Sequence, residues 1–138
     1  MDISGLRSKR KVWVPYLDGL ELLVEYLPRD ELLELSEKAV VAKFDEETKK
    51  ETETFDKRLC EKLICQQVVK GWREVTVAAD GSETYGDAFV DGDQPFNCTT
   101  ENVGLLAEKL SGFALYINKV CVDLQALNAA KKEQAEKN

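Results

Sequence analysis

Histidine is absent from the 138 residues of this chain. Its absence removes the commonest general base and the usual partner of a cysteine or serine nucleophile. The chain also lacks a phosphate-binding glycine loop and any nucleophile motif. Its 26 acidic residues place carboxylate pairs in every segment, so no pair stands out as catalytic. We therefore expect a protein that is not an enzyme.

Long apolar runs are absent as well. No stretch approaches the roughly 18 consecutive apolar residues of a membrane-spanning helix, and the first residues lack the apolar core of a signal peptide. Basic residues are in the minority, 19 against 26 acidic ones, which gives a formal net charge of -7. Phosphate binding needs a basic surface, so this charge argues against duplex nucleic acid as the main partner. We expect a soluble, cytoplasmic protein whose partners are neither nucleic acid nor membrane.

Closely paired cysteines are the third absence. Cys60, Cys65, Cys98 and Cys121 show none of the CxxC spacing of zinc sites. The segment 91–93, Asp-Gly-Asp, resembles a calcium loop only superficially, because the alternating ligands and the terminal glutamate are missing. We therefore expect four reduced and mostly packed thiols, with no metal and no other cofactor.

The first clear structural pattern is a β-hairpin over residues 12–27. Apolar residues alternate on both sides of Asp18-Gly19, a pair that tolerates the backbone of a tight turn. A lone hairpin is marginally stable, so it must lie on helices or pair with a strand of the same or a neighbouring chain. Trp13 in this hairpin is either an interface anchor or a core residue, and the core is favoured. Residues 1–10, which contain all but the last residue of a basic cluster at 7–11, are interpreted as a mobile, solvated lead-in.

Residues 30–70 are predicted to be helical. Asp30 is the expected N-cap, and apolar residues recur at helical spacing on both sides of the polar segment 45–54. That segment is interpreted as an exposed helical extension or a hinge. Glycine and aspartate dominate residues 73–98, which predicts a long loop with room for a short hairpin pairing Val75 and Val77 with Phe89 and Val90. The loop is either a variable insertion or a contact arm.

Residues 99–128 have the pattern of a helix hairpin. Thr99 is the expected N-cap of the first helix, and Ser111-Gly112 interrupts the apolar run. The second helix carries a stripe whose steps alternate four and three residues, formed by Phe113, Ile117, Val120, Leu124 and Leu127. The polar tail 129–138 has no apolar stripe of its own.

These patterns together predict a single α+β domain that is mostly α-helical. An N-terminal β-hairpin is followed by about four helices, with the long loop before the C-terminal helix hairpin. The expected core residues are Val14, Leu22, Val24, Leu35, Leu59, Leu63, Trp72, Phe96, Val103, Leu106, Leu110, Phe113, Ile117, Val120 and Leu124.

The order of these features resembles a family of phage proteins. The residues that carry the resemblance are Val12-Trp13-Val14-Pro15, Val24-Glu25-Tyr26, Gly71-Trp72, Pro95-Phe96 and Thr99-Thr100-Glu101-Asn102. In this order they are similar to the tail assembly chaperone proteins of long-tailed, siphovirus-type phages and prophages. The resemblance covers most of the chain, although the family's loop before the Pro-aromatic motif is typically shorter.

The resemblance implies a non-catalytic protein in the cytoplasm of the bacterial host. Such chaperones bind the tape measure protein and keep it soluble while tail tube subunits assemble around it, so the tape measure protein and the tail tube protein are the implied partners. Homo-oligomer formation stays open. The alternative is a structural tail or head-tail adaptor protein that is retained in the virion. The expected partner-binding residues are Trp13, Trp72, Phe113, Ile117, Leu124 and Leu127.

Overall fold

The computed structural model describes residues 10–124. Helix and strand are nearly equal in these residues, at 38% and 36%. The α+β class is therefore correct, but the prediction of a mostly helical fold is wrong. The predictions made for residues 1–9, for Leu127 and for the tail 129–138 lie outside the described residues.

Eight strands and four helices make up the described part of the chain. The named elements are β1 (Lys11–Tyr16), β2 (Leu20–Glu25), α1 (Arg29–Lys38), β3 (Val40–Asp45), β4 (Lys50–Phe55), α2 (Lys57–Val68), β5 (Val69–Val77), β6 (Glu83–Gly86), β7 (Val90–Asp91), β8 (Gln94–Pro95) and α3 (Thr100–Lys109). The fourth helix covers residues 113–124, up to the end of the described part.

A four-stranded antiparallel sheet forms the centre of the molecule, with the strand order β1-β2-β5-β6. The hairpin expected at 12–27 is β1 and β2, in which Val12 lies opposite Val24. Leu17 and Gly19 in its turn have positive φ angles of 51° and 77°. Glycine adopts a positive φ without strain, so Gly19 suits its position in the turn. Strand β5 pairs with β2, so this hairpin gains a third strand from its own chain.

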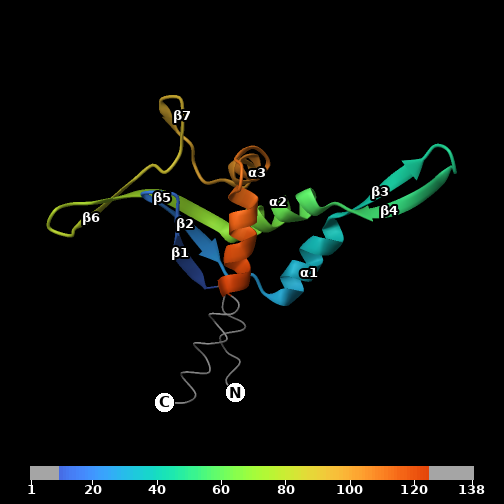
Figure 1. The fold of residues 1–138 in the computed structure, drawn as a ribbon, viewed down its shortest axis with the longest axis horizontal. Coiled ribbons are helices and arrows are strands. Elements are labelled where there is room, and N and C mark those ends of the chain that lie inside the picture. Colours follow the sequence, from blue (N-terminus) through green and yellow to red (C-terminus); the bar gives the residue numbers. More distant parts are fainter. Residues whose placement is uncertain (1–9, 125–138) are drawn as a thin grey trace, which may run out of the picture.

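Helix α2 and the helix 113–124 pack against the sheet, and α1 packs against α2. In Figure 1 the helix 113–124, orange-red, stands upright between the sheet and α1, and β5 passes behind it as the chain leaves α2. Period-two alternation turns Leu22 and Val24 inward, where both are fully buried against the helices. The ring of Tyr16 meets Phe113 edge-to-face with centroids 5.7 Å apart. The buried core comprises Tyr16, Leu22, Val24, Leu27, Leu35, Ala39, Cys60, Ile64, Cys65, Val68, Val69, Val103, Phe113, Ile117, Val120 and Cys121.

The expected core list is largely confirmed by this packing. Seven of its members are buried, namely Leu22, Val24, Leu35, Val103, Phe113, Ile117 and Val120. Seven more are partly buried against the core, namely Val14, Leu59, Leu63, Trp72, Leu106, Leu110 and Leu124. Phe96 is only half-buried and belongs to the surface cluster described below.

Residues 40–55 correct the prediction of a helical middle. They form an antiparallel hairpin of β3 and β4, here called the β3–β4 arm, with Val40 opposite Phe55 and Asp45 opposite Lys50. A spacing of four, as between Val40 and Phe44, fits one face of a helix and equally one face of a strand, which is why the pattern misled. At the turn, the amide of Glu47 donates to the Asp45 carboxylate and Lys49 takes a positive φ of 55°.

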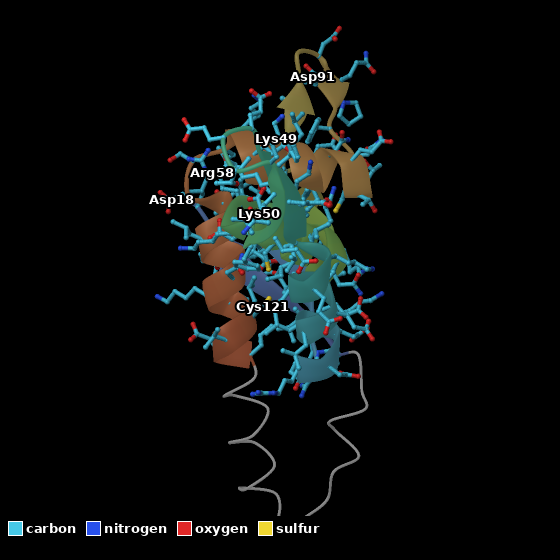
Figure 2. The ribbon with its side chains drawn as sticks, turned by 90° about the vertical axis from the view of Figure 1, so that its right-hand side faces the viewer. Asp18, Lys49, Lys50, Arg58, Asp91 and Cys121 are labelled. Atoms are coloured by element: carbon cyan, nitrogen blue, oxygen red, sulfur yellow. The ribbon has the colours of Figure 1, made fainter. Side chains whose placement is uncertain are left out.

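The β3–β4 arm projects from the body of the molecule. Figure 1 shows it extending sideways beyond α1 and α2, and Figure 2 views the molecule from that end, with Lys49 and Lys50 labelled at the arm's turn. At the base, the amide of Asp56 donates to the carbonyl of Ala39 over 2.8 Å. The Asp56 side chain then caps α2 by accepting from the amide of Leu59.

Residues 73–98 correct the prediction of a long loop. Strand β5 continues to Val77 and pairs with β6, placing Val75 opposite Tyr85 and Val77 opposite Glu83. The expected pairing of Val75 and Val77 with Phe89 and Val90 is therefore wrong. Val90 pairs instead with Pro95 in the short hairpin of β7 and β8. Strand β5 is held by β2 on its other side, an interaction that no local sequence signal reveals.

The start of α3 confirms one helix signal and the start of α1 corrects another. The amide of Asn102 donates to the hydroxyl oxygen of Thr99 over 3.1 Å, so Thr99 is the N-cap as predicted. Helix α1 begins earlier than expected, because Pro28 is its N-cap and Asp30 lies in its first turn. A carboxylate in the first turn still favours the helix through its dipole.

A candidate protein-binding groove

Trp72 organises a cluster of three aromatic side chains beside α3. Its indole lies parallel to the ring of Phe96, with centroids 5.8 Å apart, and meets Phe89 edge-to-face at 5.1 Å. Its Nε1 donates a hydrogen bond of 2.8 Å to the carbonyl of Phe96. Strand β5 thus anchors both ends of the segment that contains the β7–β8 hairpin.

The turn that leads from this cluster into α3 is locked by hydrogen bonds. Besides the cap on Thr99, the side-chain amide of Asn102 donates to the carbonyl of Asn97 over 2.8 Å. Helix α2 contributes Gln66, whose side-chain amide donates to the carbonyl of Thr100. These contacts fix where α3 starts relative to Phe96.

An apolar groove of about 390 Å³ lies between the β7–β8 segment and α3, and we call it the α3 groove. Phe89 and Phe96 form one side and Leu106 and Leu110 the other. Val90 and Leu105 also line it and are exposed, and Asp91 and Lys109 add one charge of each sign. A groove of this size and lining accepts apolar side chains of a partner.

Sequence reasoning missed Phe89, Val90 and Leu105 as lining residues of this groove. Leu105 lies off the apolar face predicted for α3, and an apolar residue on a polar face is a signal that could have been used. Phe89 and Val90 belonged to the predicted loop. Only the fold brings that segment against α3.

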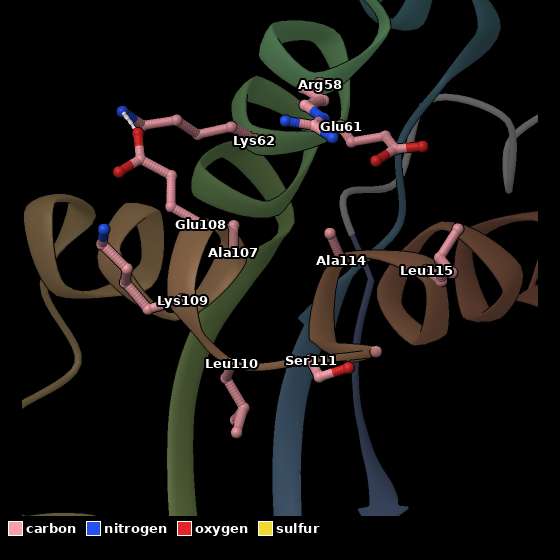
Figure 3. Close-up of a pocket in the computed structure, with 11 residues that line it drawn as sticks. Arg58, Glu61, Lys62, Ala107, Glu108, Lys109, Leu110, Ser111, Ala114 and Leu115 are labelled. Atoms are coloured by element: carbon pink, nitrogen blue, oxygen red, sulfur yellow. Dashed lines mark hydrogen bonds and ion pairs between the residues drawn. The ribbon is translucent and has the colours of Figure 1, made fainter.

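A second, more polar hollow of about 540 Å³ opens between α2 and the turn at Ser111-Gly112 (Figure 3). Lys62 on α2 and Glu108 on α3 form an ion pair of 2.5 Å across it. The hydrogen bond from Lys62 lowers the pKa of the Glu108 carboxyl. Arg58, Glu61 and Lys109 complete its charged lining. The lining contains no cysteine and no tyrosine, and Ser111 has no histidine to activate it.

The predicted partner-binding residues do not form one surface. Phe113 and Ile117 are fully buried, with 0% exposure, so a partner does not reach them in this structure. Leu124 is half-buried and packs against the core. Trp72 is half-buried and supports the α3 groove through Phe89 and Phe96.

Trp13 lies on the sheet face opposite the core, which corrects the preference for a core position. The guanidinium of Arg73 covers its ring at 3.8 Å from the centroid and also stacks on Tyr85 at 4.0 Å. Arg73 in turn pairs with the carboxylate of Glu21 at 2.8 Å. Trp13 is therefore half-buried under a cation and is not presented openly to a partner.

The four thiols are free, and Cys60, Cys65 and Cys121 are buried. Burial raises the pKa of Cys65 to about 12 and that of Cys121 to about 11. Cys98, which is half-buried, also has its pKa raised to about 11 by desolvation. A thiol with a raised pKa carries little thiolate near neutral pH and is a weak nucleophile. Within residues 10–124, no group of three or more cysteine, aspartate or glutamate side chains is placed to hold a metal ion.

None of the helices in the described part of the chain is long and apolar enough to cross a membrane. Comparison with family models, curated proteins and solved structures gives no match.

Proposed function

We propose that this protein is a non-catalytic tail assembly chaperone that binds the tape measure protein and keeps it soluble while the tail tube assembles. One observation supports the proposal above all. Three of the five segments behind the family resemblance meet at the α3 groove: Trp72 supports it, Phe96 lines it, and Thr99 and Asn102 fix the helix that forms its other side.

The α3 groove suits a helical client. An amphipathic helix presents apolar side chains every three or four residues, and one or two of them fill a groove of this volume. Leu105 and Val90 are exposed at its mouth, where a client helix would cover them. The formal charge of -7 keeps a complex with an aggregation-prone client soluble through repulsion between complexes.

Co-expression with a tape measure protein tests the proposal. The soluble fraction of the tape measure protein, and the amount that co-purifies, are compared with and without this chain. Leu105→Gln in the α3 groove is compared with Leu33→Gln, which replaces a leucine of similar exposure on α1, 51% against 45%. We expect Leu105→Gln to lose most of the soluble client and Leu33→Gln to retain it.

Two results contradict the proposal. A tape measure protein that is equally soluble alone, with nothing co-purifying, removes the chaperone function. Equal loss from Leu105→Gln and Leu33→Gln removes the α3 groove as its site.

A further inference from the structure

The β3–β4 arm exposes apolar side chains that no other part of the described chain covers. Phe44 and Phe55 are 65% and 52% exposed, and Val40 at the base is 42% exposed. A two-stranded hairpin standing alone is marginally stable in water, because its faces bury little. Exposed aromatic residues on such an element indicate an interaction surface.

The two faces of the arm differ in chemistry. Residues directly opposite each other in an antiparallel pair share a face. The register therefore places Val40 with Phe55, Ala42 with Glu53, and Phe44 with Glu51 on one face. The opposite face carries Val41, Lys43, Asp45, Lys50, Thr52 and Thr54.

The first face, here called the acidic-apolar face, has its charges on one side only. Val40, Ala42 and Phe44 form an apolar row along β3, and Glu51 and Glu53 lie beside it on β4. Neither glutamate forms an ion pair with another described residue. A row of apolar side chains bordered by free carboxylates complements an apolar surface bordered by cations.

The spacing of the side chains in the apolar row matches the spacing of apolar side chains along one face of a helix. Alternate residues of a strand are about 6.6 Å apart along its axis, and residues i and i+4 of a helix are about 6 Å apart. A helix lying along β3 therefore keeps its apolar stripe over Val40, Ala42 and Phe44. Its flank on the β4 side then faces Glu51 and Glu53.

We propose that the acidic-apolar face of the β3–β4 arm docks an amphipathic helix whose apolar stripe is flanked by lysine or arginine on one side. The identification of this helix with a segment of the tape measure protein rests on the proposed function. The docking surface and the chemistry of its partner helix are inferred independently of the proposed function. A contact confined to one face of a two-stranded hairpin is small, and small interfaces are typically weak and transient, which suits a client that must be released.

Binding of a synthetic peptide tests the surface directly. The probe is a helical peptide of about 18 residues with a leucine stripe and lysines on one flank, and a second peptide carries glutamate in place of lysine. Affinity is measured by calorimetry with the full chain. Glu51→Gln/Glu53→Gln is compared with Thr52→Lys/Thr54→Lys, which raises the net charge by the same two units on the opposite face. Circular dichroism confirms that each variant is folded.

We expect the lysine peptide to bind more tightly than the glutamate peptide. The two glutamine substitutions should weaken it roughly fivefold, as expected for losing two exposed ion pairs, and the two lysine substitutions should have a smaller effect. Phe44→Ser should weaken both peptides, by roughly tenfold for the lysine peptide. Val77→Ser, at an exposed valine of β5, is the apolar control.

Three results overturn the proposal. In the first, the two double variants weaken binding equally, which reduces the effect to net charge. In the second, both peptides bind alike. In the third, neither peptide binds while the chain forms a dimer that Phe44→Ser dissociates, which assigns the face to a second copy. If the peptide results hold but the tape measure protein is equally soluble without this chain, the proposed function fails and the docking surface stands.

Discussion

Trp72 shows how one side chain sets the shape of a surface that it does not itself present. Its indole ring and its Nε1 hydrogen bond hold the segment around Phe96 against β5. Two substitutions of Trp72 separate the loss of stability caused by removing the hydrogen bond from the loss caused by removing the ring.

We expect Trp72→Phe to lower the free energy of unfolding by about 1 kcal/mol, because the carbonyl of Phe96 loses its donor while the aromatic contacts remain. Trp72→Ala should cost more, since Phe89 and Phe96 lose their packing partner. Urea denaturation measures both. Trp13→Phe is the control because the Trp13 indole has no hydrogen-bond partner among residues 10–124. Equal effects of Trp72→Phe and Trp13→Phe would contradict this account.

The buried thiols make stability depend on alkaline pH. Burial raises the pKa of Cys65 from 9.0 to about 12 and that of Cys121 from 9.0 to about 11. The folded state therefore keeps these protons at a pH where the unfolded chain loses them. The stabilisation from neutral thiols is complete below about pH 9 and is lost as the pH rises through 11 and 12.

We expect the free energy of unfolding to fall steadily above pH 9, as measured by urea denaturation at pH 7, 9, 10 and 11. Tyr16, whose pKa burial also raises, adds to the decline at the upper end. In Cys121→Ala the decline should be shallower, even though stability at pH 7 is lower. A flat profile between pH 7 and pH 11 would show that these thiols ionise alike in both states.

At the scale of elements, the β3–β4 arm is separable from the core. No residue between 40 and 55 is buried, whereas Ala39 at the base is fully buried. The hydrogen bond from Asp56 to Ala39 joins the two ends of the arm independently of its length.

We expect the arm to be removable with little loss of stability. Replacing residues 42–53 by Asn-Gly leaves Val41 opposite Thr54 across a two-residue turn, which suits a tight hairpin. The free energy of unfolding should stay within about 1 kcal/mol of the parent, because no buried apolar area is lost. Thermal denaturation and near-ultraviolet circular dichroism measure this. A collapse of tertiary signal would show that the arm is part of the folding unit.

At the scale of the whole molecule, a chaperone and a structural adaptor differ in whether they remain in the finished particle. An adaptor is retained in a closed ring with a fixed, symmetric copy number. A chaperone releases its client when the tube is complete.

We expect this protein to be missing from purified phage particles and abundant in infected cells before tails are complete. Quantitative mass spectrometry of both samples measures this, with the tail tube protein as the internal standard. A constant ratio of this protein to the tube protein in finished particles would contradict the chaperone proposal and favour an adaptor.

Sequence alone was sufficient for most local signals, although the cap expected at Asp30 lies instead at Pro28. The Asp18-Gly19 turn, the cap at Thr99 and the helix break at Ser111-Gly112 each act on residues within a turn of themselves, so their chemistry predicts the structure directly. The buried stripe at Phe113, Ile117 and Val120 was likewise predicted, because its period fits a helix and not a strand.

Tertiary structure decided the rest. The four-residue spacing of Val40 and Phe44 fits a helix and a strand equally, and only pairing with β4 selects the strand. Strand β5 forms because β2, about 50 residues earlier in the chain, pairs with its residues 69–74, and β6 pairs with its end up to Val77. The α3 groove forms because the Trp72 ring packs against Phe89 and Phe96 and holds them beside α3. These contacts join residues far apart in the sequence, and the burial that favours them is a property of the assembled core.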